Sequence, residues 1–222
     1  MVWDFLTRGI AKIIQAHVHP VCSISWSRSG RRVVSASTDN TVSIWDVVNG
    51  ECDQKFRFPS PVLKVQFHPR VEEDILVTPM RHAAVVVTLS TDPTIPASNN
   101  HRTVPLDDEN DPQIVASYDT RGKYIFTGNS RGKILIFEDK RPNDKCDFKQ
   151  VSQFKVTQQA SSTTAVKGIE FSRRGTLTDL YTCSLIQSIL TLFLGGSFLV
   201  NTADRVIRVY KTRDVLKLAN DK

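Results

Sequence analysis

His17, Ser37 and Asp39 are the residue types from which hydrolases build a base, a nucleophile and an orienting acid. A serine hydroxyl becomes nucleophilic beside a histidine, and an aspartate holds that histidine in the required tautomer. Far along the chain, Thr202 and Asp204 repeat the spacing of Ser37 and Asp39. Because a unique active site has no reason to be duplicated, the repetition indicates a structural role for both sets.

The other candidate ligands lack the spacing that metal or redox chemistry requires. The acidic stretch 107–112 lacks the alternating ligands and central glycine of a calcium loop, and the sequence contains no glycine-rich phosphate loop. We therefore predict no metal, no cofactor, no small-molecule substrate and no enzymatic activity. We interpret four histidines as turn or surface residues and the four cysteines as reduced, mostly buried thiols: His19, His68, His82, His101, Cys22, Cys52, Cys146 and Cys183.

The composition is that of a globular protein. The 222 residues are 40% hydrophobic and 23% charged, which is enough to bury a core. The net charge of +6 favours a negatively charged partner, although the basic residues are scattered. The N-terminal residues lack the features of a secretory signal, which favours an intracellular protein.

An internal repeat carries the fold prediction, because Trp45-Asp46 echoes Trp3-Asp4 at the spacing of propeller blades, roughly 40–45 residues. Each repeat reads as three short alternating strands separated by polar turns, followed by a segment that would form a fourth strand. An antiparallel sandwich with similar spacing is the alternative. The predicted units are approximately 1–58, 59–105, 112–156 and 164–222.

The His, Ser, Asp and Trp positions of the repeat resemble those of WD-repeat proteins, in which a His, a Ser or Thr, a turn Asp and a Trp are hydrogen-bonded within a blade. The resemblance implies an all-β, partial WD-repeat β-propeller with about four blades. It also implies structural hydrogen-bond networks from His17, Ser37, Asp39 and Trp45, and again from Thr202 and Asp204. A turn carboxylate of this kind is costly to bury unless donors satisfy it, so loss of Asp39 should destabilise the fold.

The amino-acid sequence of the repeats is similar to that of the retinoblastoma-binding protein 5 family, in segments 2–14, 34–40, 56–61, 63–70 and 201–210. That resemblance implies a non-catalytic nuclear scaffold subunit of COMPASS or MLL-type complexes, whose SET-domain enzymes methylate lysine 4 of histone H3. The expected partners are the SET-domain methyltransferase, the other core subunits and the nucleosome, with no membrane contact. In that family several arginines lie near DNA phosphates, and the one whose motif occurs here is Arg205.

The sequence departs from the family pattern in two ways. It is expected to be a fragment, because the family has seven blades and a C-terminal tail that binds partners. The stretch 176–196 also separates the first and second strands of the last unit. In the third unit the corresponding positions, Tyr118 and Tyr124, are only six residues apart. We hypothesise a translated intron; the alternatives are a genuine loop and a short membrane-associating segment, which a mid-blade position disfavours.

Two other functions stay open at this point. The chain could be a different WD-repeat adaptor, one associated with RNA, because one fold serves many functions. An enzyme ranks third, because the repeat accounts for every candidate catalytic residue.

Overall fold

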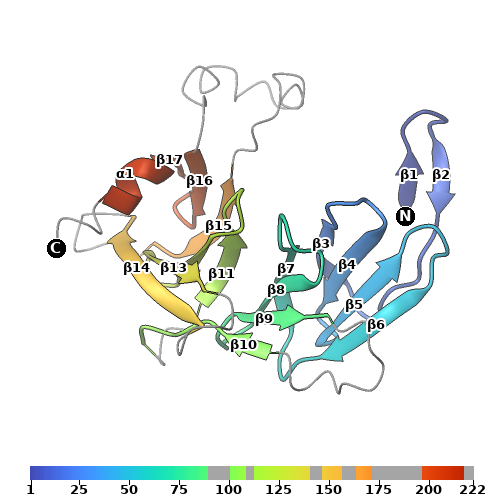
Figure 1. Ribbon diagram of the computed structural model, residues 1–222, viewed down its shortest axis with the longest axis horizontal. Helices are drawn as coiled ribbons and strands as arrows, with labels where there is room; N and C mark the ends of the chain where they lie inside the picture. The colour runs from blue at the N-terminus through green and yellow to red at the C-terminus, as the bar shows by residue number, and fades with distance from the viewer. Residues whose placement is uncertain (90–100, 109–112, 141–146, 157–163, 172–196, 218–222) are drawn as a thin grey trace. The chain divides into compact units, whose positions relative to one another are not determined.

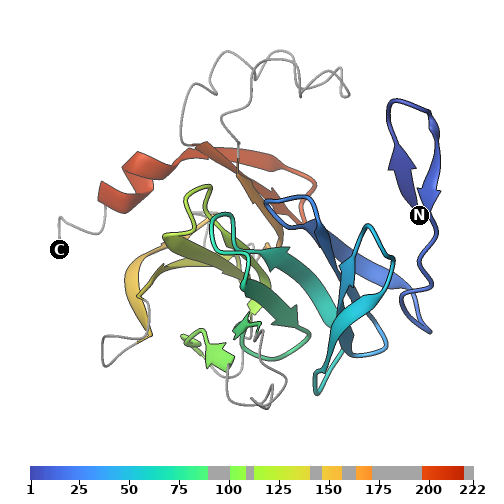
Figure 2. The ribbon, with the colours of Figure 1, turned by 45° about the vertical axis from the view of Figure 1, so that its right-hand side comes forward.

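The computed structural model describes residues 1–89, 101–108, 113–140, 147–156, 164–171 and 197–217. Antiparallel strands form nearly all of the regular structure in these residues, and a short helix follows the last strand (Figures 1 and 2). The chain falls into two compact units, Met1–Tyr118 and Asp119–Lys222. The prediction of an all-β chain is confirmed.

The first unit contains a hairpin, two four-stranded sheets and the first strand of a third sheet. Its strands are β1 (Val2–Asp4), β2 (Gly9–Lys12), β3 (Val21–Trp26), β4 (Arg32–Ser37), β5 (Thr41–Asp46), β6 (Cys52–Arg57), β7 (Val62–Phe67), β8 (Asp74–Pro79), β9 (Val85–Thr88), β10 (His101–Thr103) and β11 (Gln113–Tyr118). In both complete sheets each strand pairs with the next one along the chain, in the orders β3-β4-β5-β6 and β7-β8-β9-β10. This meander is the topology of a propeller blade, whereas a sandwich is built from Greek-key connections.

The core of the first unit lies between the facing sides of these two sheets. Strand alternation places apolar side chains of β4 and β5 on the side that meets β7 and β8. Burial of this surface is the main stabilising term where the apolar sides of the two sheets meet. The buried cluster includes Val34, Ala36, Val42, Ile44, Val62, Val65, Phe67, Ile75 and Val77.

Serine hydroxyls join the first strands of the two sheets. The backbone N–H of Val65 donates to Ser23 Oγ at 3.2 Å, and the N–H of Phe67 donates to Ser25 Oγ at 3.1 Å. These two amides point away from the ladder of their own sheet, so the hydroxyls satisfy donors that would otherwise be left unpaired at the junction. The alternating serines of β3 therefore fix how β7 lies against it.

The second unit contains strands of two further sheets. They are β12 (Tyr124–Asn129), β13 (Lys133–Asp139), β14 (Phe148–Lys155), β15 (Val166–Phe171), β16 (Ser197–Thr202) and β17 (Ile207–Lys211), in the orders β11-β12-β13-β14 and β15-β16-β17. Phe126 contacts Phe171 and Phe198, with both pairs of ring centroids 4.9 Å apart. These aromatic contacts form part of the core of this unit.

A helix follows β17 where the repeat pattern predicts a fourth strand. Helix α1 (Thr212–Lys217) carries Asp214 in its first turn, where a carboxylate interacts favourably with the helix dipole. Its Val215 is buried, and the Val215 carbonyl accepts a hydrogen bond from Ser152 Oγ on β14 at 3.2 Å. Local helix-forming residues and this docking contact outweigh the strand pattern here.

The stretch 176–196, for which the sequence suggests an intron, a loop or a membrane segment, lies outside the described residues. The strands on either side of it are direct antiparallel neighbours, with Phe171 opposite Phe198. The chain therefore leaves and re-enters one sheet at adjacent positions. Among the described residues, no helix has the length and apolar character needed to cross a bilayer.

Candidate functional site

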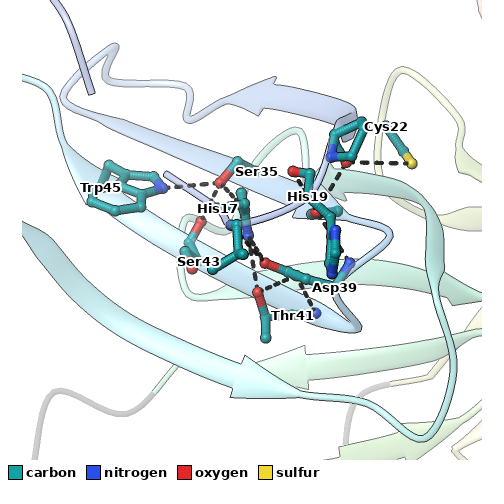
Figure 3. Close-up of polar contacts among 11 residues, drawn as sticks. His17, His19, Cys22, Ser35, Asp39, Thr41, Ser43 and Trp45 are labelled. Carbon is teal, nitrogen blue, oxygen red and sulfur yellow. Dashed lines mark hydrogen bonds and ion pairs between the residues drawn. The ribbon is translucent and has the colours of Figure 1, made fainter. Parts of the chain in front are cut away.

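The turn between β4 and β5 brings together the residues that could form a catalytic triad (Figure 3). His17 comes from the segment before β3, and its Nδ1 lies 3.1 Å from Asp39 Oδ2 and 2.9 Å from Thr41 Oγ1. Its other ring nitrogen, Nε2, lies 2.7 Å from Ser35 Oγ. The indole N–H of Trp45 donates to the same Ser35 oxygen at 2.9 Å.

The direction of these hydrogen bonds follows from the donors that are fixed. An indole N–H only donates, so Ser35 accepts from Trp45; of the two acceptors near its own proton, His17 Nε2 at 2.7 Å is closer than the Ser43 carbonyl oxygen at 3.4 Å. His17 then carries its proton on Nδ1 and donates it to Asp39, whose second oxygen accepts from the hydroxyl of Thr41 at 2.6 Å. The chain of bonds from Trp45 to Asp39 is complete without any outside group.

The serine in this network is Ser35, not Ser37 as the sequence pattern predicts. The Ser37 hydroxyl lies 3.0 Å from the carbonyl oxygen of His19 and 2.9 Å from that of Pro20, and it accepts from the Asp39 N–H at 3.2 Å. Both serines lie on the same side of β4 because they are two residues apart. Ser37 thus fastens the turn to the segment before β3, while Ser35 joins the histidine to the tryptophan.

The turn holds Asp39 in its ionised form. Burial on its own would raise the pKa of this carboxyl, but the hydroxyl and amide of Thr41 and the neighbouring His17 outweigh it and lower the pKa to about 2. The backbone N–H of Thr41 donates to Oδ1 at 2.9 Å. The next residue, Asn40, has a φ of 67°, a conformation that Asn tolerates better than most residues.

This geometry supports structure and not catalysis. A serine, a histidine and an aspartate stand in the order of a triad, but the His17 side chain is 0% exposed and Asp39 is 10% exposed. Ser35 is buried, and its oxygen already accepts the indole proton. A nucleophile must reach a substrate atom at about 3 Å, with donors placed for the oxyanion. A substrate cannot approach the Ser35 oxygen without unfolding the turn.

The turn between β16 and β17 uses the corresponding aspartate differently. Thr202 Oγ1 donates to Asp204 Oδ1, and Arg208 on β17 pairs with Asp204 Oδ2 through Nη2 at 2.7 Å. Arg208 Nη1 also donates to Thr202 Oγ1 at 2.5 Å. The contact with Arg208, followed by that with Thr202, holds the pKa of Asp204 well below its usual range. Tyr210, at the position of Trp45, stacks on Phe198 instead of joining these bonds.

Arg205, the predicted DNA contact, lies exposed at the tip of the same turn. Its φ is 63°, close to the 67° of Asn40 and the 72° of Gly132 at the matching positions of other turns. Arginine is uncommon in this left-handed region. Its backbone N–H donates to the Thr202 carbonyl at 3.1 Å, which holds this conformation.

The remaining candidates have local roles. His68 is buried, and its Nδ1 accepts the N–H groups of Arg70 and Val71 at 3.1 and 2.9 Å, which shapes the turn before β8. Cys22 and Cys52 are free thiols but exposed, so the prediction of mostly buried thiols is wrong for these two. Within the described part of the chain, His, Cys, Asp and Glu side chains form no cluster that could hold a metal ion. Cys146, Cys183 and residues 109–112 lie outside it.

Sequence reasoning missed three residues of these two turns: Ser35, Thr41 and Arg208. Ser35 and Thr41 are signalled only by their hydroxyls on a strand next to the turn aspartate. Arg208 had a clearer signal, because it is a charged residue in the strand Ile207–Lys211. Arg208 is four residues after Asp204, on the strand that follows the turn, so its side chain can reach the aspartate.

Comparison with known proteins agrees with the repeat pattern. The family model "WD domain, G-beta repeat" matches residues 10–46. The solved β-propeller domain of Cps50 (Swd1) from Myceliophteria thermophila superposes with a TM-score of 0.73 at 20% identity, over 94% of this chain and 57% of that one. The sheets, the turn network and this likeness define a WD-repeat β-propeller chain.

Sequence similarity extends over the whole chain. The chain is 50% identical over 221 residues to the retinoblastoma-binding protein 5 homolog of Drosophila melanogaster, which covers 100% of this chain and 38% of that protein. It is 22% identical over 224 residues to the Set1 complex component swd1 of Schizosaccharomyces pombe, covering 97% and 48%. The chain belongs to the retinoblastoma-binding protein 5 family of WD-repeat proteins. It spans less than half the length of these relatives.

Proposed function

We propose that this chain is part of a non-catalytic scaffold subunit of a nuclear histone H3 lysine-4 methyltransferase complex, where it supports assembly and nucleosome engagement. The observation that carries the proposal is the 50% identity over the whole chain to a retinoblastoma-binding protein 5 homolog. The relationship to a protein named as a Set1 complex component points to the same kind of assembly. The expected partners are a SET-domain methyltransferase and the other core subunits.

The chemistry of the turn between β4 and β5 supports a scaffold role. Its Ser, His and Asp side chains form hydrogen bonds with one another and with Trp45, in a site closed to solvent. A satisfied buried network of this kind stabilises one turn geometry and leaves no group available for reaction. Such turns make the sheets rigid platforms for partner proteins.

Arg205 is the residue we propose for contact with nucleosomal DNA. Its guanidinium is exposed and has no side-chain partner among the described residues, in contrast to Arg208, which Asp204 holds. Arg205, at the tip of the β16–β17 turn, has a φ of 63°, a left-handed conformation that Arg8 and Arg81 also adopt in their own hairpin turns, so exposure and charge carry the proposal. A guanidinium stays charged and donates two parallel hydrogen bonds, which suits a phosphate.

The test of the assembly role is affinity purification of the full-length protein from its own cells. We expect a SET-domain methyltransferase to co-purify, together with methyltransferase activity on histone H3 lysine 4. Recovery of ribosomal or splicing proteins without a methyltransferase would instead support the RNA-associated adaptor and would contradict the proposal.

The test of Arg205 compares nucleosomes with free histone peptide as substrates of the assembled complex. Arg205→Glu should lower methylation of nucleosomes about tenfold and leave methylation of an H3 peptide unchanged, because only the nucleosome presents DNA phosphates. An equal effect on both substrates would show that Arg205 acts on folding or assembly.

A further inference from the structure

A groove of about 560 Å³ opens between the two four-stranded sheets of the first unit. It lies where β4 begins and β5 ends, and Arg32 pairs with Asp46 across these strands. The β4–β5 turn with Asp39 is at the other end of the same strands, so the groove and the buried network occupy opposite ends of the sheet. Its volume falls within the range of about 300–1,000 Å³ that is usual for ligand sites.

The accessible lining of the groove is mainly charged, because Ile44 and Leu89 beneath it belong to the buried core. Four carboxylates and two guanidiniums make up the charged part: Asp46, Asp53, Glu72, Glu73, Arg31 and Arg32. The groove therefore carries an excess of negative charge on a chain whose net charge is +6. Its local sign is opposite to that of the chain as a whole.

Several of these groups are fixed before any partner arrives. Glu72 accepts the backbone N–H of Ser29 at 2.6 Å and its hydroxyl at 2.9 Å, which ties the turn before β8 to the turn after β3. Asp46 accepts the N–H groups of Val48 and Asn49 at 2.8 and 3.0 Å. Preorganised walls reduce the entropy that a partner loses on binding.

Other charges in the groove are weakly engaged. Arg32 Nε is 3.8 Å from Asp53 Oδ2, a long contact between side chains that are 36% and 39% exposed. The exposed Glu73 has no side-chain partner among the described residues. An unpaired carboxylate beside a half-satisfied one is suited to a cation supplied from outside.

We propose that this groove binds a lysine- or arginine-bearing segment of a protein partner. The cationic end of the partner's side chain lies between Asp53 and Glu73. Nucleic acid does not fit, because its phosphates would face four carboxylates. The groove includes neither Arg205 nor a DNA contact, so its binding can be tested independently of the proposed nucleosome contact.

The test measures binding of a fluorescein-labelled peptide of alternating lysine and glycine to the full chain by fluorescence anisotropy. A matched peptide with glutamate in place of lysine serves as the first control. Saturable binding of the lysine peptide at low salt, without binding of the glutamate peptide, is the expected result. Absence of saturable binding of the lysine peptide, or equal binding of both peptides, overturns the proposal.

Charge-reversal variants locate the site. Glu73→Lys and Asp53→Lys should each weaken binding of the lysine peptide about fivefold, and Arg31→Ala should strengthen it about twofold. Asp147→Lys makes the same charge change on an exposed residue of the second unit and should have no effect. An equal loss in Asp147→Lys would show nonspecific attraction. Loss of duplex DNA binding on Arg31→Ala would make the groove a nucleic-acid site; either result contradicts the proposal.

Discussion

The β4–β5 turn and the β16–β17 turn each place an aspartate after a Ser or Thr, yet they hold it in different ways. Asp39 is paired with a histidine that comes from 22 residues earlier in the chain, in a site closed to solvent. Asp204 is paired with Arg208, four residues away on the adjacent strand, with the two side chains 30% and 22% exposed. The first network ties a distant segment to the sheet, whereas the second closes only its own hairpin.

The difference shows why a repeated residue need not have a repeated energetic role. A buried carboxylate that loses its donors leaves several groups unsatisfied at once. An exposed pair on one hairpin contributes little, because water and salt replace its partner. An aspartate at the same position of the repeat can therefore be essential for stability in one turn and dispensable in another.

The largest expected effect is that of Asp39→Ala. This change leaves His17 and the Thr41 amide without their acceptor, and we expect a loss of about 3 kcal/mol in the free energy of unfolding. Urea unfolding followed by circular dichroism measures it. Asp204→Ala is the matched control and should shift the urea midpoint only slightly. Equal shifts in the two variants would remove the distinction between the turns.

Acid titration tests the Asp39 turn next. Because the pKa of Asp39 is lowered to about 2 in the folded state, its ionised form stabilises the fold above the unfolded value of roughly 4. That contribution, about 2 kcal/mol, is lost as the pH falls from about 4 to about 2. Asp39→Asn should flatten the fall in unfolding free energy over this range. A variant as pH-sensitive as the wild type would contradict the assignment.

Ser35→Ala should cost about 1–2 kcal/mol, because it removes the acceptor of the Trp45 indole and the donor to His17. Thr127 is the matched control, since it occupies the corresponding position of β12 and its buried hydroxyl has no hydrogen-bond partner within the described residues. Thr127→Val should leave thermal stability unchanged or raise it. A larger loss from Thr127→Val than from Ser35→Ala would refute the network.

Salt should produce the smallest effect, and only on the β16–β17 turn. The exposed Asp204–Arg208 pair is screened at high ionic strength, so any stability difference between Arg208→Leu and the wild type should vanish in concentrated salt. The effect of Asp39→Ala should persist there, because its partners are buried. Melting temperatures measured in low and high salt provide the comparison.

The sequence was sufficient to predict the sheets but not the partners within the turns. Alternating apolar residues and polar turns predict three short strands in each unit, and β4 (Arg32–Ser37) is one of these strands, because strand period and turn chemistry are local properties. The choice between Ser35 and Ser37 is not local. Both lie on one side of β4, and which of them meets His17 depends on how the segment before β3 returns to the sheet.

The two ends of β17 show the same limit. Thr202 and Asp204 were predicted from their spacing, but the donor to Asp204 was not, because the strand pattern gives no reason to prefer Arg208 over a residue from another segment. Helix α1 replaces a predicted strand because Val215 finds a buried contact beside β14 that the sequence does not reveal. Long-range packing decides both.

The central claim is that this chain acts as a platform within a histone H3 lysine-4 methyltransferase complex. The most direct measurement is nucleosome methylation by the complete complex, purified with either wild-type or Arg205→Glu subunit, alongside methylation of free H3 peptide. We predict an intact complex with lower activity on nucleosomes and unchanged activity on peptide. A protein that assembles with no methyltransferase, or an Arg205 variant with full nucleosome activity, would contradict the account.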